Sequence, residues 1–219
     1  VYTLFWSPKG GSGTTVVAAA MALLSARSTP TVLIDLGGDA SAALGASAPS
    51  GPGLSEWLAS AHATDASLWR LSVEVSSNLQ LLHSGAGAAP LSDLQSERLA
   101  TAASGPLQPD IVIDAGPQIG PPPLHRCATR SIIVVRPCYL ALQRAVRHPR
   151  LATGAVIVDE PGRALRAVDV ERALGVPVLA EIPWDPSVSR SIDAGLLSSR
   201  MPSSLVRALS RLVDVEVAR

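Results

Sequence analysis

Short apolar segments alternate with longer segments rich in Ala and Leu along almost the whole chain. The short segments are apolar throughout instead of alternating with polar residues, which is typical of strands that are buried on both faces of a sheet. We predict strands at Tyr2–Trp6, Thr31–Asp35, Leu79–His83, Asp110–Asp114, Ser131–Val135, Ala155–Val158 and Pro177–Ile182.

The segments between these strands have the composition of helices. We predict helices near Thr15–Arg27, Leu54–His62, Leu91–Ala103, Leu140–Arg147, Ala167–Leu174 and Ser203–Val213. Regular alternation of the two kinds of segment predicts an α/β fold: a doubly wound, mostly parallel sheet with helices on both faces. In such folds ligands bind beyond the carboxyl ends of the strands.

The remaining segments read as loops or stay unassigned. Gly, Pro, Ser and Ala cluster at Ser47–Gly53, Ser84–Pro90 and Gly116–Pro123, which predicts loops there. The stretch Ala61–Asn78 has no clear period and receives no assignment. Because the chain has neither an internal repeat nor a long linker, we expect residues 1–219 to form a single domain.

Composition excludes several classes of protein. With 219 residues, 47% of them apolar, the chain is long and apolar enough for a sizeable core. Basic and acidic residues number 18 each, so no overall charge favours nucleic acid. The two cysteines form no CxxC pair, which disfavours a disulfide framework or structural zinc and favours a reducing cytoplasm. No run approaches the ~20 apolar residues of a membrane span.

A glycine-rich segment with the sequence SPKGGSGTT, Ser7–Thr15, lies directly between the first strand and the first helix. Glycines let backbone N–H groups surround a phosphate, and the helix adds its positive N-terminal end. A hydroxyl at the helix start, that of Thr15, is placed to ligate Mg²⁺. The segment departs from the ordinary P-loop at Pro8, where a glycine is usual, and at Thr14, where the lysine is usual. The residues predicted to bind nucleotide are Lys9, Gly10, Gly11, Ser12, Gly13, Thr14 and Thr15.

Lys9 is the only lysine in the chain, since every other Lys or Arg position is an arginine. A compact ammonium on a flexible stem fits a crowded phosphate site better than a planar guanidinium does. The position of the single lysine therefore supports a phosphate-binding function for this loop.

The loop resembles that of the MinD/ParA-type deviant P-loop ATPases, whose signature is K-G-G-x-G-K-[ST]. The matching residues are Lys9, Gly10, Gly11, Gly13 and Thr15, and Thr14 replaces the second lysine. This resemblance implies ATP and Mg²⁺ as cofactors and a homodimer formed with nucleotide. It also implies that Lys9 is a catalytic residue that reaches the nucleotide of the partner subunit.

Two apolar strands end in aspartates, which places carboxylates at the carboxyl edge of the sheet. The segment Val32–Asp39 resembles the family's strand ending in D-x-D, with Asp35 as a catalytic and Mg²⁺-organising residue. Gly37 stands where the family has its second Asp, and Asp39 is the candidate replacement. The segment Asp110–Pro117 resembles the Walker B strand, with Asp114 near Mg²⁺ and Gly116 near the γ-phosphate.

Two later segments resemble the family's base-binding regions. Asp159 follows an apolar strand where the family has an Asn that reads adenine, so the choice between adenine and guanine stays open. The segment Gly175–Asp185 resembles the G-V-P-x-L-x-x-I-P-x-D pattern. The backbone near Pro183 and Asp185 is then expected to line the base pocket.

Two functions follow from the resemblance. Because Thr14 and Gly37 replace charged residues, we expect weak or lost hydrolysis and a positioning or assembly scaffold with a protein partner. A small residue in place of the second lysine also occurs in the TadZ/CpaE branch, which assembles pili at cell poles. The alternative is an active, slow ATPase for DNA partitioning or division-site placement.

Other features leave alternatives open. Arg136 follows a buried strand, either as part of a simple turn or as a contact for phosphate or a partner. Cys127 and Cys138 are expected to pack as small apolar residues, and no chemical role is assigned to the four histidines.

The apolar side of the last helix is expected to pack on the sheet, with a membrane or a DNA surface as weaker alternatives. The arginines of that DNA alternative are Arg190, Arg200, Arg207 and Arg211.

Overall fold

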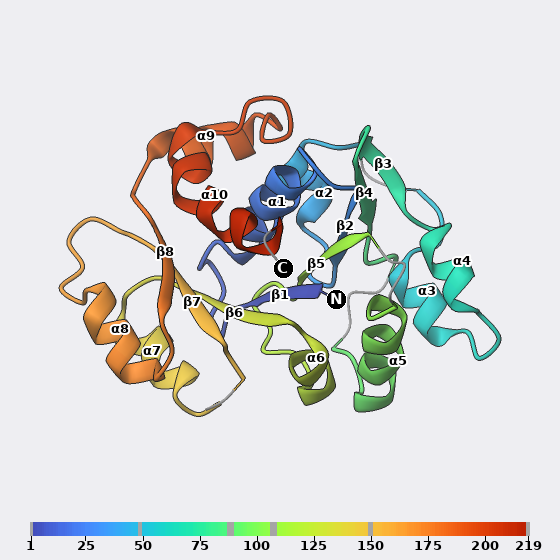
Figure 1. The fold of residues 1–219 in the computed structure, drawn as a ribbon, viewed down its shortest axis with the longest axis horizontal. Helices are drawn as coiled ribbons and strands as arrows, with labels where there is room; N and C mark the ends of the chain where they lie inside the picture. Colours follow the sequence, from blue (N-terminus) through green and yellow to red (C-terminus); the bar gives the residue numbers. More distant parts are fainter. Residues whose placement is uncertain (1, 48–49, 87–89, 106–108, 149–150, 218–219) are drawn as a thin grey trace.

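The computed structural model describes residues 2–47, 50–86, 90–105, 109–148 and 151–217. Within these ranges eight strands form one sheet in the order β3-β4-β2-β5-β1-β6-β7-β8 (Figure 1). Neighbouring strands are parallel except for β3, which is antiparallel to β4. The strands are β1 Tyr2–Trp6, β2 Thr31–Asp35, β3 Val73–Ser76, β4 Leu79–Leu82, β5 Asp110–Asp114, β6 Arg130–Val135, β7 Gly154–Val158 and β8 Val178–Ile182.

Helices cover both faces of this sheet (Figure 1). Helices α1, α2, α9 and α10 pack on one face, and α3, α5, α6, α7 and α8 pack on the other. The fold is therefore the predicted doubly wound α/β fold. The helices are α1 Thr14–Ser25, α2 Ala40–Leu44, α3 Leu54–Ala59, α4 Asp65–Trp69, α5 Asp93–Ala103, α6 Pro122–Cys127, α7 Tyr139–Ala145, α8 Ala167–Leu174, α9 Pro186–Asp193 and α10 Ser203–Val217.

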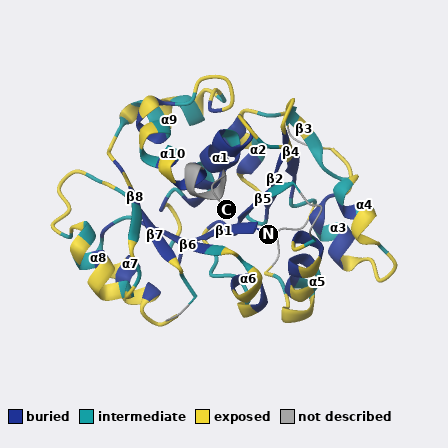
Figure 2. Cartoon of the chain, in the orientation of Figure 1, coloured by how far each residue is buried: buried dark blue, intermediate teal, exposed yellow. Residues whose placement is uncertain are grey.

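The central strand β1 shows why the strands are apolar throughout. Each of its residues is buried, with Leu4 and Trp6 in the core on one face and Phe5 in the core on the other. Figure 2 shows the same burial along the neighbouring strands. Because β1 lies between β5 and β6, the loop that follows it opens at the middle of the sheet's carboxyl edge.

The structure also differs from the sequence predictions. Within the unassigned stretch 61–78 it has a helix, α4, and a half-buried edge strand, β3. The short helices α2 and α9 were not predicted. The predicted loop Gly116–Pro123 was wrong at its end, because α6 begins at Pro122, and proline is tolerated in the first turn of a helix. Residues 48–49 and 87–89 of the other predicted loops lie outside the described residues.

Helix α10 packs against α1 and β8, as expected for its apolar side. Leu205, Leu209, Leu212 and Val213 are buried, whereas Arg207 is exposed. In the described part of the chain, no helix is both long enough and apolar enough to cross a bilayer.

The packing of α10 can be tested by truncating Leu209, which is completely buried. Leu209→Ala is expected to lower the free energy of unfolding by about 2–5 kcal/mol, because it leaves a cavity between α10 and the core. Arg207→Ala on the same helix is the control and is expected to change it by less than about 0.5 kcal/mol. Urea unfolding measures both, and equal small effects would contradict the packing described here.

Candidate functional site

The loop between β1 and α1 is held by two serine hydroxyls. Oγ of Ser7 lies 2.9 Å from Oγ of Ser12, and the two hydroxyls lie 3.0 and 2.8 Å from the carbonyl oxygen of Lys9. Gly11 and Gly13 have φ angles of 74° and 90°, which L side chains adopt only with strain. The sequence explains the glycines, but the role of Ser7 as the anchor of the loop was not predicted.

Lys9 itself is half-buried, and its side chain stays at the rim of the loop. Its Nζ lies 3.3 Å from the carbonyl oxygen of Gly10, in an exposed hydrogen bond. The ammonium is also close enough to Glu160 to lower the pKa of that carboxyl. A phosphate can replace its exposed contact with Gly10. The expected contact with a second subunit concerns another copy of the chain and stays a prediction.

Helix α1 begins at Thr14, one residue before the predicted start. Thr14 is buried and Thr15 is half-buried, at the first turn of the helix. The hydroxyl of Thr15 is close enough to Asp114, at the end of β5, to lower the pKa of that carboxyl. The structure therefore places the predicted Mg²⁺ residues Thr15 and Asp114 side by side.

Asp114 is completely buried at the carboxyl end of β5. Its Oδ1 accepts a hydrogen bond of 2.8 Å from the N–H of Gly116, and its Oδ2 has no partner among the described residues. Burial raises the pKa of Asp114 to about 7, against the smaller lowering by Thr15 and Gly116. A buried carboxylate oxygen without a partner is costly, which is expected where a ligand completes the site.

Asp35 lies beside Asp114 in the sheet register, at the end of β2. The N–H groups of Gly37 and Gly38 donate to its Oδ1 at 2.9 and 2.7 Å, and the N–H of Ala40 donates to its Oδ2 at 2.9 Å. Burial is the largest influence on Asp35 and raises its pKa. The carboxylate thus shapes the turn after β2 in addition to any contact with a metal.

Asp39 is exposed at the start of α2, and its negative charge raises the pKa of both Asp35 and Asp114. It is therefore near both buried carboxylates. The structure brings together the three predicted carboxylates of the site, although Asp39 reaches it from the surface.

The loops after β2 and β5 approach each other at two glycines. A Cβ added to Gly116 would lie 3.3 Å from Cα of Gly37, and one added to Gly37 would lie 3.4 Å from Cα of Gly116. Gly116 also has a φ of 60°, whereas Gly37 does not adopt the left-handed conformation. The close approach fixes the position of Gly116 next to Asp114.

A cavity of about 240 Å³ opens beside the start of α1. Most of its lining is apolar, as is usual for sites that bind a small molecule. Gly13 of the phosphate loop lies on one side, and Asp159, Pro183 and Asp185 lie on the other. Its remaining lining residues are Val16, Val17, Arg136, Val158, Ile182, Trp184, Val188, Ser189, Ile192, Asp193 and Leu205.

The two predicted aspartates of this cavity differ in their bonding. Asp185 accepts hydrogen bonds from the N–H of Ser187 at 2.8 Å and from the hydroxyl of Ser204 at 2.6 Å. These bonds hold the pKa of Asp185 at about 2, and they tie α9 to α10. Asp159 is exposed, and its Oδ1 accepts the N–H of Glu160 at 2.9 Å. Asp159 is therefore the more available of the two carboxylates for a ligand.

One buried histidine has a structural role that was not predicted. His125 of α6 lies between the hydroxyl of Ser131, 2.8 Å from Nδ1, and the carbonyl oxygen of Ile119, 2.5 Å from Nε2. Its ring stands edge-on to Trp6 at 5.2 Å, and the indole N–H of Trp6 donates to the same Ser131 hydroxyl. Burial lowers the pKa of His125. This network ties the loop after β5 to β1.

The cysteine prediction was wrong for Cys127, which is exposed, whereas Cys138 is half-buried. Both thiols are free. Cys127 stands at the end of the short helix α6, where the side chain points out of the core that α6 covers with Leu124.

No protein family model matches the sequence, and no curated protein matches it. Solved structures do match. A ParA family ATPase from Chlorobium tepidum TLS is 18% identical, with a TM-score of 0.75, over 97% of this chain and 98% of that chain. MinD from Pyrococcus horikoshii OT3, complexed with Mg-ADP, is 19% identical, with a TM-score of 0.73, over 100% and 96% of the two chains. This chain has the MinD/ParA fold.

A third similar structure is an ATP complex of a McdA variant from Cyanothece. It is 18% identical to this chain, with a TM-score of 0.74, over 100% of this chain and 96% of that chain. At these identities the likeness establishes the fold, and the candidate site rests on the residues described above.

The carboxyl edge of this MinD/ParA fold fits Mg²⁺ bound together with phosphate. Among the residues described, no group of three or more His, Cys, Asp or Glu side chains forms a metal cage. Magnesium usually takes one or two carboxylates and fills its other positions with water and substrate phosphates. Thr15, Asp35 and Asp114 provide such a partial set, and Oδ2 of Asp114 offers the unpartnered acceptor that a metal-bound water needs.

The raised pKa of Asp114 predicts how stability depends on pH. A carboxyl whose pKa is about 7 in the folded state, against ~3.9 when unfolded, makes the folded protein lose stability as pH rises between these values. Asp114→Asn is expected to flatten this dependence and, at pH 8 without nucleotide, to stabilise the protein by on the order of 2 kcal/mol. Urea unfolding from pH 4 to pH 8 measures it.

The control for this experiment is Asp39→Asn, which removes an exposed carboxylate near the same site. Parallel pH dependences for Asp114→Asn and the unmodified protein would contradict the raised pKa.

Proposed function

We propose that this chain binds ATP with Mg²⁺, dimerises with nucleotide and acts as a spatial regulator of the MinD/ParA type with weak or lost hydrolysis. The observation that carries the proposal is the unpartnered, buried Oδ2 of Asp114 beside Thr15, at the end of a glycine-rich loop. The apolar cavity next to Gly13 supplies a place for the base. Mg²⁺ would neutralise phosphate charge, while the loop amides and Thr15 hold and orient the triphosphate.

Weak turnover follows from the charges that this site lacks. A triphosphate carries about four negative charges, of which Mg²⁺ neutralises two. Thr14 provides no cation, and Gly37 provides no carboxylate to orient a water molecule. Loss of one charge-assisted hydrogen bond in the transition state costs roughly 1.5–3 kcal/mol, which slows the reaction ~10–100-fold. Binding survives such a loss better than catalysis does.

Dimerisation gives the nucleotide its regulatory effect. Lys9 at the loop rim is available to reach the phosphates of a second subunit. Nucleotide and partner then favour the same dimeric state, so each strengthens the binding of the other. A complex of MinC with MinD from Aquifex aeolicus is among the solved structures similar to this chain, at 18% identity and a TM-score of 0.75. We propose a protein partner for this chain by analogy.

Within this class we favour a cytoplasmic assembly scaffold, at a pole or a membrane surface, in the manner of the TadZ/CpaE branch. Thr14 in place of lysine supports this branch. A DNA surface has weaker support, from the exposed arginines Arg190, Arg200, Arg207 and Arg211.

An active, slow ATPase for DNA partitioning or division-site placement is the second candidate function. One observation favours it: Asp39 is exposed and near enough to influence both Asp35 and Asp114. Its carboxylate is therefore a candidate to orient the attacking water in place of the acid missing at Gly37.

Phosphate release from MgATP separates the two candidate functions. The scaffold predicts negligible release, and it predicts that the combined substitution Thr14→Lys and Gly37→Asp raises release ~10–100-fold, because both missing charges return. The backbone at Gly37 accepts an L residue, since its Cβ would stand 3.4 Å from the nearest neighbour. Adding Lys9→Ala to that variant is the control and is expected to abolish the gain.

Rapid release by the unmodified protein, lost in Lys9→Ala, would contradict the scaffold. Loss in Asp39→Asn as well would identify Asp39 as the residue that replaces the missing acid.

Asp159 predicts that the site accepts GTP in addition to ATP. A carboxylate only accepts hydrogen bonds, which matches the two adjacent N–H donors of guanine, whereas adenine presents one donor and one acceptor, which match an amide. Asp159→Asn is expected to raise the ratio of ATP to GTP affinity about tenfold. Asp193→Asn, on the same cavity, is the charge-matched control. Calorimetric titration measures both ratios, and an unchanged ratio in Asp159→Asn would contradict a base contact.

A further inference from the structure

Arg136 lies close to the start of the phosphate loop. It directly follows β6, which is paired with β1 so that Ile133 lies opposite Trp6. The phosphate loop begins immediately after Trp6, so the residue that ends β6 emerges beside it. Arg136 also lines the cavity together with Gly13, the last residue of the loop. The backbone thus brings a guanidinium to the boundary between the phosphate loop and the base cavity.

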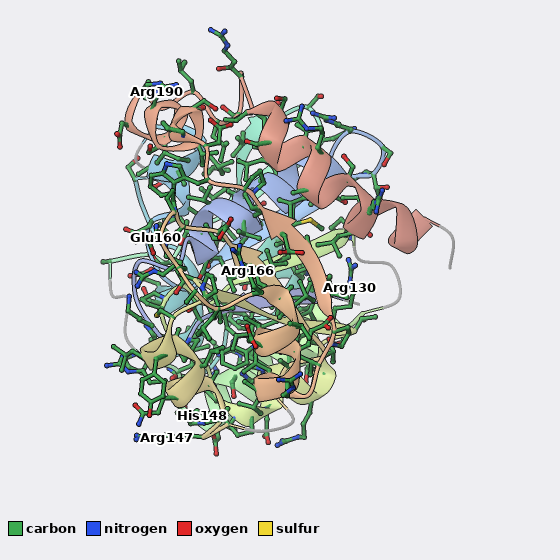
Figure 3. The ribbon with its side chains drawn as sticks, turned by 90° about the vertical axis from the view of Figure 1, so that its left-hand side faces the viewer. Arg130, Arg147, His148, Glu160, Arg166 and Arg190 are labelled. Carbon is green, nitrogen blue, oxygen red and sulfur yellow. The ribbon has the colours of Figure 1, made fainter. Side chains whose placement is uncertain are left out.

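The guanidinium of Arg136 is only weakly paired. Its Nη1 lies 3.9 Å from Oε1 of Glu160. The other oxygen of Glu160, Oε2, accepts two hydrogen bonds from Arg163, at 2.9 and 2.7 Å. Figure 3 shows Glu160 on the side of the molecule between α9, marked by Arg190, and the turn after α7, marked by Arg147. Arg163 therefore already neutralises most of the charge of Glu160. The positive charge of Arg136 remains available for an anionic ligand.

A second observation concerns the Nε atom of Arg136. Its Nε is buried and has no hydrogen-bond partner in the part of the chain that the structure describes. Buried donors are nearly always satisfied, so an unsatisfied one is expected where a ligand or a rearrangement supplies the acceptor. The side chain is 33% exposed, which leaves its outer nitrogens accessible from the cavity.

The other charged side chains that line the cavity are carboxylates. Asp185 is engaged by Ser187 and Ser204, and Asp159 accepts the N–H of Glu160. Asp193 is the third carboxylate of the lining. Among the described residues that line the cavity, Arg136 is the one cationic side chain. A polyanion beside Gly13 would therefore find its nearest lining cation at Arg136.

We infer that Arg136 binds the phosphates of a nucleotide in the same subunit and supplies the positive charge that Thr14 does not provide. The inference rests on the proposed function and adds to it a binding residue and its ligand group. On binding, the guanidinium exchanges its long contact with Glu160 for charge-assisted hydrogen bonds to phosphate, and Glu160 stays paired with Arg163. The site then balances its charge with an arginine after β6 instead of a second lysine in the loop.

The test compares the affinities of MgATP, MgADP, AMP and adenosine by calorimetric titration. Arg136→Gln is expected to weaken MgATP binding ~10–100-fold and to change adenosine binding less than about twofold, since adenosine has no phosphate. Arg136→Lys is expected to retain most of the affinity. Arg126→Gln changes an exposed arginine that does not line the cavity and is the matched control, with an expected change of less than about threefold for every ligand.

Two further variants extend the test, and the first of them does not depend on the folding of Arg136→Gln. Glu160→Gln removes the competing carboxylate and is expected to tighten MgATP binding by about threefold or more, without an effect on adenosine. Thr14→Lys in the Arg136→Gln background is expected to restore MgATP binding about tenfold. Thermal melting without ligand shows whether each variant is folded.

The outcomes distinguish a failure of the proposed function from a failure of the assignment of Arg136. If the unmodified protein binds none of the four ligands, the proposed function fails. If it binds MgATP and Arg136→Gln loses nothing, or loses ATP and adenosine affinity equally, the assignment of Arg136 is overturned while nucleotide binding stands. An unchanged MgATP affinity in Glu160→Gln also overturns the assignment.

Discussion

The buried carboxylate of Asp114 is the interaction on which the rest of the site depends. It stands at the carboxyl end of β5, between β1 and β2, where the sheet cannot offer its second oxygen a hydrogen-bond donor. Burial opposes its ionisation, and only a nearby cation or donor can offset that cost. The position makes the free site electrostatically incomplete. In the proposed function a metal ion held with phosphate completes it, which would link nucleotide binding to the stability of the sheet edge.

The surroundings of Asp114 hold that edge in place. Two serine hydroxyls fix the phosphate loop, the approach of Gly37 to Gly116 fixes the loop after β5, and His125 ties that loop to β1. The positive charge is distributed unusually, with one lysine at the loop rim and one arginine after β6. We propose that this arrangement suits the site to hold a nucleotide better than to hydrolyse it, as a switchable scaffold requires.

The sequence predicts the parallel strands because burial on both faces makes them apolar throughout, and this determines the α/β fold. It predicts the phosphate loop because the conformation of the loop requires glycines and the start of the helix places a hydroxyl, and both requirements are local. It misses β3, a four-residue edge strand that is only half-buried on one side. It also misses His125, whose partner Trp6 is far away in the sequence, and no local pattern records such a contact. Asp114 is predictable as a site residue, but its unpartnered oxygen emerges only from the packing.

Proton release on MgATP binding, measured by calorimetry at pH 7 in two buffers of different ionisation enthalpy, tests the central role of Asp114 most directly. A carboxyl with a pKa of about 7 that becomes fully ionised beside Mg²⁺ releases roughly half a proton at this pH, in addition to any release by the ligand itself. This release is expected to disappear in Asp114→Asn. Identical proton release by both proteins would contradict this expectation.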